Sequence, residues 1–174
     1  HAAYTSQGIV VDDAYIAFRY ASNLAHGVGL TYNPGGERVE GYTCFSWVLL
    51  GALLERVGVP AAVALPLLGI LAGAATLVVV ARSIRALRVA AGEPPPAWAG
   101  LPSALFLAVT PGFAYYAGSG LETPLFGLCV ALTVGAALEG RPRRASVFAV
   151  AALLTRPEGA AIGAMALAVG LARG

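Results

Sequence analysis

Charged side chains are scarce in this sequence, and lysine is absent from it. Basic and acidic residues together make up 11% of the 174 residues, whereas soluble domains carry about 25%. The hydrophobic fraction is 58% and the mean hydropathy is +0.76, well above the roughly 45–50% apolar content of soluble domains. This composition argues against an ordinary soluble domain and predicts a membrane protein.

Cysteine and histidine are also rare, with two of each in the chain. Cys44 and Cys129 stand in separate predicted helices, without ligand-like spacing to His26 or to each other. The pattern therefore favours neither a zinc site nor a disulfide, and both cysteines are interpreted as small apolar filler. The net charge of +2 is uninformative about nucleic acid in a spanning chain, where the position of each charge matters. We predict no nucleic-acid partner.

Long uncharged runs take the place of the missing charges. Residues 60–81 and 97–121 contain no charged side chain, and each is long enough to cross a hydrocarbon core of about 30 Å at about 1.5 Å per residue. Residues 123–138 form a third, shorter run, and 145–172 form a fourth that "TRPEG" interrupts. Proline breaks a helix and frees backbone groups, so "TRPEG" is expected at the tip of a broken or re-entrant helix pair. The predicted fold is all-α, a polytopic membrane helix bundle.

The arginines set the expected orientation of this bundle. "RSIRALR" follows the first run and "EGRPRR" follows the third, and the positive-inside rule places both on the cytoplasmic side. Residues 1–59, "YYAGSGLETP" and "TRPEG" then face outward. The chain begins with His1 and enters polar sequence directly, so we expect a fragment that lacks at least one upstream anchor.

Two parts are predicted along the chain, an external segment over 1–42 and membrane helices over 43–174. In the first part, apolar residues recur at helical spacing from Asp13 to His26, with Asp13 as N-cap and Gly27 as the stop. A turn-rich loop follows, with a short hairpin left open, and then a half-buried helix within 43–58 that is too short to span.

Ionisable residues near membrane depth are expensive and indicate function by default. The outward-facing carboxylates and Arg156 are expected to converge on one external cavity, where a carboxylate serves as general base or metal ligand and arginine grips a phosphate. The candidate catalytic residues are Asp12 and Asp13. The candidate substrate-binding residues are Arg19, Glu40, Tyr42, Glu122, Arg156 and Glu158, with Glu37 beside Glu40 in the loop.

Each candidate also has a plain structural interpretation. Asp13 could serve only as a helix cap, and Arg19 could lie on a solvated helix face. Glu122 could be an interfacial anchor, while Arg156 and Glu158 could form an internal ion pair. Asp12 has the weakest structural explanation.

Three motifs, "DDAYIAFRYASNLAHGVGLTYNPGGERVEGYTCFSW", "GLETPLF" and "TRPEG", occur in an order that resembles membrane glycosyltransferases of the C-type fold. The resemblance is strongest to the family of the mycobacterial terminal arabinofuranosyltransferase, whose members use polyprenyl-phosphate sugars. Cys44 and Ser46 depart from the pattern of that family. The family has further membrane helices, so the fragment is expected to be inactive alone.

The resemblance implies a multi-pass protein of the bacterial plasma membrane with its acidic motif outside. It would transfer a glycosyl residue, arabinofuranosyl being one option, from a lipid-linked donor to a hydroxyl of a cell-envelope glycan or another acceptor. One aspartate would be the base, with Asp12 slightly favoured over Asp13, and a divalent metal ion is left open. Membrane lipids would be its surroundings. The alternatives are a transporter or lipid-handling protein, and a noncatalytic assembly subunit.

Overall fold

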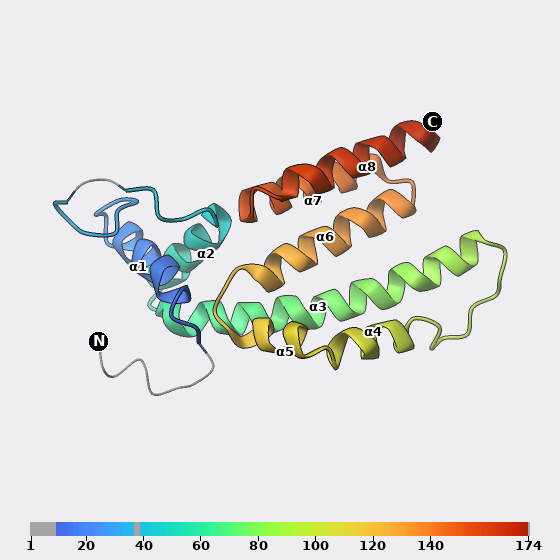
Figure 1. Cartoon of the computed structure of the whole chain (residues 1–174), viewed down its shortest axis with the longest axis horizontal. Coiled ribbons are helices and arrows are strands. Elements are labelled where there is room, and N and C mark those ends of the chain that lie inside the picture. The colour runs from blue at the N-terminus through green and yellow to red at the C-terminus, as the bar shows by residue number, and fades with distance from the viewer. Residues whose placement is uncertain (1–9, 37–38, 174) are drawn as a thin grey trace.

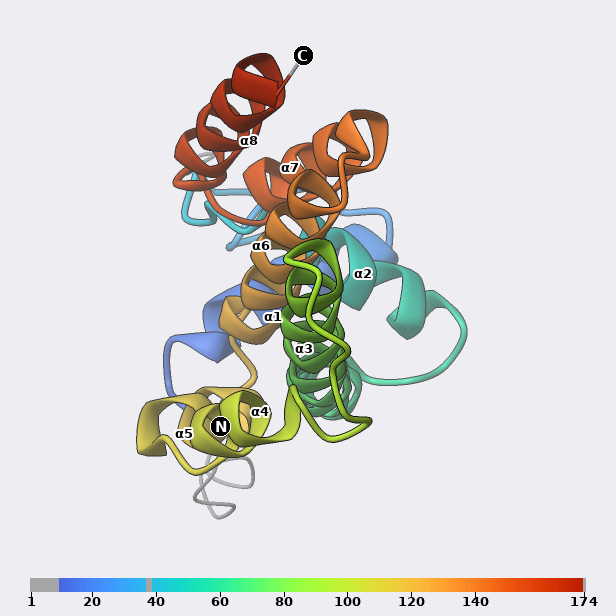
Figure 2. The same ribbon diagram turned by 90° about the vertical axis from the view of Figure 1, so that its right-hand side faces the viewer.

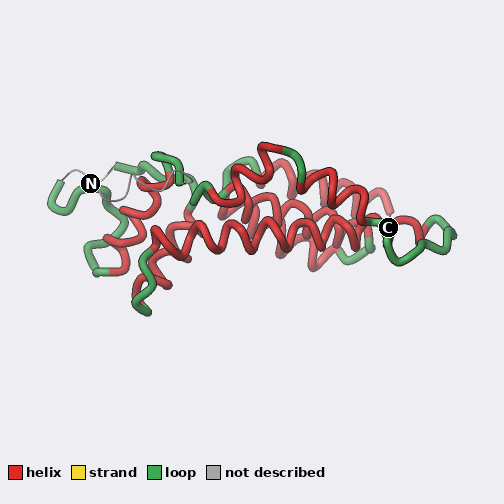
Figure 3. The backbone as a smooth tube through the Cα atoms, turned by 90° about the horizontal axis from the view of Figure 1, so that it is seen from below, coloured by secondary structure: helices red, strands yellow, loops and turns green. Residues whose placement is uncertain are grey.

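The computed structural model describes residues 10–36 and 39–173, and its regular structure there is entirely helical (Figure 1). The all-α prediction is confirmed, and the hairpin left open for the loop does not form in its described residues (Figure 3). The helices are α1 Ala14–Ala25, α2 Phe45–Arg56, α3 Ala61–Ala90, α4 Leu101–Ala108, α5 Pro111–Gly118, α6 Thr123–Leu138, α7 Pro142–Thr155 and α8 Gly159–Arg173.

Helices α1 and α2 pack together at one end of the elongated molecule (Figure 1). The buried face of α1 carries Ala14, Ala17, Phe18 and Ala21, as the helical spacing predicts, together with Tyr20. These residues join the buried side chains of α2 and the start of α3 in one apolar core. Gly27 follows the helix with φ +81°, a conformation that glycine adopts without strain.

The remaining length of the molecule is built from helices that run side by side. Helix α3 packs against α6, α6 against α7, and α7 against α8 (Figures 1 and 2). Small residues allow close approach at Gly69 and Gly73 of α3. A Cβ at Gly69 would lie 2.6 Å from the carbonyl oxygen of Ala117, and a Cβ at Gly73 would lie 3.5 Å from the Ala117 Cβ.

The prediction of one continuous span over 97–121 is wrong. This run divides into α4 and α5 at Thr110, which has extended dihedrals, φ −68° and ψ 118°. The residue before a proline is disfavoured in the helical conformation, and Pro111 has no backbone N–H to continue α4. The run carries no charge along its whole length, so length and lack of charge alone conceal the break.

The length criterion for a membrane span is met, among the described residues, by α3, whose 18-residue window has a mean hydropathy of 2.5. Helix α3 also continues past residue 81 to Ala90, through the arginine-bearing turns. Helices α5 and α6 meet the same test jointly, although they are bent by 117° at their junction. They would count as a second span only if the bent pair crosses as one unit.

The expected break at "TRPEG" is confirmed. Helix α7 ends at Thr155 because Arg156, ahead of Pro157, is extended at φ −151° and ψ 141°. Helix α8 then begins at Gly159 and runs back along α7 (Figure 1). The turn between them lies toward the end of the molecule that holds α1 and α2.

Candidate functional site

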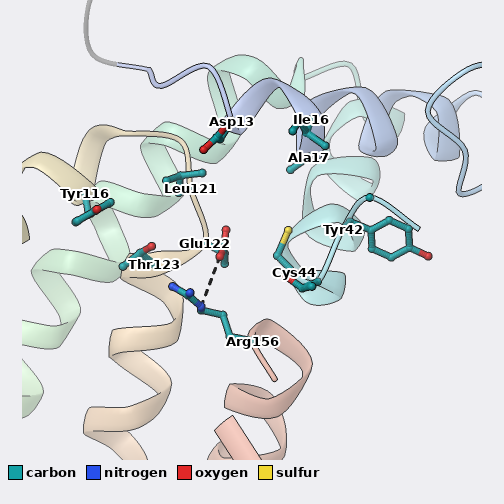
Figure 4. Close-up of a pocket in the computed structure, with 12 residues that line it drawn as sticks. Asp13, Ile16, Ala17, Tyr42, Cys44, Tyr116, Leu121, Glu122, Thr123 and Arg156 are labelled. Carbon is teal, nitrogen blue, oxygen red and sulfur yellow. Dashed lines mark ion pairs between the residues drawn. The ribbon is translucent and has the colours of Figure 1, made fainter. Parts of the chain in front are cut away.

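A cavity of about 500 Å³ lies where α1, the loop before α2, the α5–α6 turn and the α7–α8 turn meet (Figure 4). Four of the predicted site residues line it. The full lining is Asp13, Ile16, Ala17, Gly41, Tyr42, Thr43, Cys44, Tyr116, Leu121, Glu122, Thr123 and Arg156. Side chains separated by more than a hundred positions in the sequence are therefore brought to one place.

The two aspartates of the acidic motif are placed differently. Asp13 occupies the N-cap position of α1, as predicted, but its carboxylate makes no capping hydrogen bond. The same side chain lines the cavity, whereas Asp12 does not. The backbone carbonyls of Asp12 and Asp13 accept the N–H groups of Tyr15 and Ile16. The local backbone thus closes the first turn without the Asp13 carboxylate, which remains available for chemistry.

Arg156 lies between two carboxylates on the opposite side of the cavity. Its Nε is 3.8 Å from Glu122 Oε1, and its Nη2 is 3.2 Å from Glu158 Oε1. The guanidinium also lies 5.7 Å from the centre of the Phe126 ring, a favourable arrangement for a cation. The Glu122 side chain is only 14% exposed, whereas that of Glu158 is 63% exposed.

These contacts give the two glutamates different surroundings. Glu122 points into the cavity with Arg156 (Figure 4), whereas Glu158 lies outside the lining. A hydrogen bond that its carboxylate accepts from its own backbone N–H, and the nearby Arg156 guanidinium, lower the pKa of Glu158. Glu158 therefore stays ionised and holds Arg156 from the solvent side. The internal ion pair considered from the sequence is present, and it leaves Arg156 at the cavity wall.

Tyr42 lines the cavity with its ring directed away from Glu122 and Arg156 (Figure 4), and Tyr20 holds the segment around it in place. The Tyr20 hydroxyl donates to the Val39 carbonyl at 2.6 Å and accepts from the Gly41 N–H at 3.1 Å. The rings of Tyr20 and Tyr42 are 4.8 Å apart. Burial, Glu40 and Tyr20 raise the pKa of Tyr42. Sequence reasoning missed Tyr20: it lies on the buried face of α1 but was not among the residues predicted for that face.

Arg19, predicted to bind substrate, instead holds the loop after α1. Its Nε donates to the Tyr32 carbonyl at 2.7 Å, its Nη2 donates to Asn33 Oδ1 at 3.3 Å, and its guanidinium lies 4.8 Å from the Tyr32 ring centre. Neither Arg19 nor Glu40 lines the cavity. Glu37 lies outside the described residues.

Cys44, interpreted from the sequence as apolar filler, lies at the cavity wall and is only 8% exposed. Next to it, the hydroxyls of Ser46 and Thr155 are 2.9 Å apart and join α2 to α7. The Trp47 indole N–H donates to the Gly120 carbonyl at 2.9 Å and anchors the turn that carries Glu122. No sequence signal other than proximity to the acidic residues would have identified these contacts.

The pKa of the Cys44 thiol depends on the charged groups that line the cavity. Burial and the nearby Glu122 carboxylate raise the pKa of Cys44 to about 11, against a smaller lowering by its own backbone hydrogen bond and by Arg156. Thiolate is the reactive form of cysteine. In a Cys129→Ser background, alkylation by iodoacetamide should therefore keep accelerating as the pH rises through 10.

Glu122→Gln should move this rate profile to lower pH, because the carboxylate that disfavours the thiolate is removed. Glu158→Gln is the matched control, since Glu158 is not among the groups that shift the pKa of Cys44, and its profile should match the parent. A rate that levels off below pH 9 in the parent would contradict this environment for Cys44.

The residues present do not assemble a protein metal site. Within 10–36 and 39–173, no group of three or more His, Cys, Asp or Glu side chains comes together in a metal-binding arrangement. The two cavity carboxylates belong to opposite walls, and Arg156 is already paired with one of them. We therefore derive no step through a divalent ion.

No protein-family model, curated protein or solved structure matches this chain. The resemblance to C-type glycosyltransferases consequently stays a prediction, supported by the three sequence motifs. What the structure adds is spatial: parts of all three motifs meet at one cavity, through Asp13, Glu122 and Arg156.

Proposed function

We propose that this chain belongs to a polytopic membrane glycosyltransferase that transfers a sugar from a polyprenyl-phosphate donor to an acceptor hydroxyl. The observation that carries the proposal is the convergence of Asp13, Glu122 and Arg156 on the cavity of about 500 Å³. The Asp13 carboxylate makes no capping hydrogen bond, and the Arg156 guanidinium lies on the facing wall. The first can accept a proton and the second can bind a phosphate, as the transfer reaction requires.

Exposed apolar surface supports the membrane location. On α3, Leu67, Leu71 and Val78 are 55%, 64% and 51% exposed. On α4 and in the connection after it, Phe106 and Val109 are 75% and 73% exposed. Soluble monomers rarely leave contiguous apolar surface of this kind uncovered. Lipid would cover it at no cost, which favours a bundle embedded in a bilayer.

The proposed chemistry uses the two cavity walls for two tasks. Asp13 takes the proton of the acceptor hydroxyl as that oxygen forms a bond to the anomeric carbon. The bond from this carbon to the phosphate oxygen breaks, and the polyprenyl phosphate leaves with the bond's electron pair. Arg156 stabilises the charge that develops on the leaving phosphate. Glu122 orients Arg156, and Tyr116 supplies aromatic surface for the sugar. A single displacement of this kind inverts the anomeric centre.

A transfer assay on the full-length protein that carries this sequence tests the proposal. The protein, reconstituted in liposomes, should move label from a polyprenyl-phosphate [¹⁴C]arabinofuranose to a soluble glycan acceptor and release polyprenyl phosphate in equal amount. Related polyprenyl-phosphate pentoses and hexoses serve as parallel donors, because the cavity does not define the sugar.

Two results would overturn the proposal. Translocation of intact donor across the liposome membrane, without transfer, would assign the cavity to lipid handling or transport. Absence of both transfer and translocation with every donor would favour a noncatalytic subunit.

A further inference from the structure

Opposite the cavity, the molecule ends in a group of arginines that the proposed reaction does not use. They are Arg82, Arg85 and Arg88 near the end of α3 and Arg141, Arg143 and Arg144 around the start of α7. We refer to these six residues as the arginine end. Helix α3 finishes and the α6–α7 turn lies at the same extremity, away from α1 and α2 (Figures 1 and 2).

A close contact between α3 and α6 fixes where the two groups of arginines lie relative to each other along the helix axes. A Cβ at Gly135 of α6 would lie 2.8 Å from Ser83 Oγ of α3. The last turn of α6 therefore lies beside the first arginine of α3. The chain turns back beyond Leu138, so the α7 arginines lie near the level of the first arginine-bearing turn of α3, which extends beyond them (Figure 1).

Most of this positive charge is not neutralised by the protein. Arg141 pairs with Glu139 at 2.9 Å. In the described part of the chain, the other five arginines take part in no ion pair, and all five side chains are exposed. Besides Glu139, Glu93 is the one acidic residue in the segments that form this end. Such a concentration of exposed guanidinium groups attracts anions.

The uncharged part of α3, which leads up to the arginine end, is about as long as the hydrocarbon core of a bilayer is thick. The uncharged part of α3, residues 61–81, is about 31 Å long at about 1.5 Å per residue, close to the roughly 30 Å of a hydrocarbon core. Trp98 lies near the end of this uncharged part, next to the first arginine of α3, because Gly100 two residues later packs against the backbone of Ala81. The Trp98 side chain is 61% exposed, and exposed tryptophan beside arginine is typical of a membrane interface.

We propose that the arginine end is a binding surface for the phosphate groups of anionic membrane lipids. Guanidinium groups hold phosphate through paired hydrogen bonds, and basic clusters next to a span attract anionic headgroups. A soluble polyanion would satisfy the arginines but leave Val78 and Trp98, 51% and 61% exposed, in water. A lipid covers both kinds of surface at once. The inference rests on the proposed membrane location and is independent of glycosyl transfer.

Fluorescence quenching of Trp98 by brominated lipids tests this surface. The purified full chain in a neutral detergent is titrated with brominated phosphatidylglycerol and, separately, with brominated phosphatidylcholine. We expect phosphatidylglycerol to reach half-quenching at a mole fraction at least about tenfold lower, and the difference to shrink in 1 M salt. Trp98→Phe should remove the lipid-dependent signal, because the other tryptophan, Trp47, is 1% exposed.

The triple variant Arg82→Gln, Arg85→Gln, Arg88→Gln should lose most of the preference for phosphatidylglycerol. Arg56→Gln is the matched control, because Arg56 is exposed at the opposite end of the molecule, and it should keep the parental preference. Helical content measured by circular dichroism should be unchanged in both variants. Soluble glycerol phosphate should fail to displace the lipid at millimolar concentration.

Several outcomes would overturn the proposal, and they separate it from the membrane location. Equal quenching by both lipids, an unchanged triple variant, or displacement by soluble glycerol phosphate would each exclude an anionic-lipid surface while leaving the membrane location intact. Quenching by neither lipid would exclude both the surface and the interfacial position of Trp98.

Discussion

Asp13→Asn should lower the rate of glycosyl transfer by roughly 10²–10⁴-fold, the range usually assigned to general-base catalysis. An amide cannot accept the proton of the acceptor hydroxyl. Folding should be preserved, because asparagine caps a helix about as well as aspartate, and the Asp13 carboxylate makes no capping hydrogen bond that the amide would need to replace. The measurement is the single-turnover rate at saturating donor, with the amount of folded protein in the membrane matched to the parent.

Asp12→Asn is the matched control for this substitution. Asp12 is adjacent in sequence and is the same type of residue, but its side chain does not line the cavity. The sequence slightly favoured Asp12 as the base, whereas the geometry favours Asp13, so the two variants should differ by at least about tenfold. A larger loss in Asp12→Asn would restore the original assignment. Parental rates in both variants would remove the acidic motif from the mechanism.

Arg156→Lys should weaken the use of the lipid-phosphate donor without removing the positive charge. Lysine lacks the planar fork that donates two parallel hydrogen bonds to phosphate. The loss of charge-assisted hydrogen bonds costs about 1–3 kcal/mol, which corresponds to a rise in donor KM of about 5- to 150-fold. The variant is measured by donor titration at fixed acceptor concentration.

Glu158→Gln separates the phosphate role of Arg156 from its ion pair. The pair spans 3.2 Å, but the Glu158 side chain is 63% exposed, and exposed pairs contribute little. Donor KM should therefore change by only about fivefold or less. If Arg156→Lys leaves donor KM at the parental value, Arg156 serves the internal pair alone, and the phosphate must be held elsewhere.

The sequence predicted the local features of the fold better than the helix boundaries inside apolar runs. Apolar spacing identified α1, and Pro157 identified the break between α7 and α8, because both signals act over a few residues. Pro111 gives the same kind of signal, but the span over 97–121 was predicted from the length and the lack of charge of the run, and neither property reveals a break at a proline. At both prolines, the restriction that proline places on the backbone was a more reliable signal of a helix end than the lack of charge in the surrounding run.

The expected convergence on one cavity is seen for residues that stand near a helix end. Asp13, Glu122 and Arg156 each stand at such an end, and all three line the cavity. Arg19 shows the opposite case. Its partners are the carbonyl of Tyr32 and the side chain of Asn33, in a loop 13 and 14 residues away. No periodic pattern encodes the path of that loop, so the role of Arg19 could not be read from the sequence.

The hydrogen bond from Trp47 to Gly120 has a consequence for biosynthesis. It joins residues 73 positions apart, and the bond between Ser46 and Thr155 spans 109 positions. Closing such long loops comes late, because the entropy of the intervening chain must first be lost. A nascent chain still held on the ribosome before Arg156 emerges can form α1 and its acidic turn, but not the complete cavity. The acidic motif is therefore synthesised before the cavity is assembled, which requires the end of α7 to pack beside it.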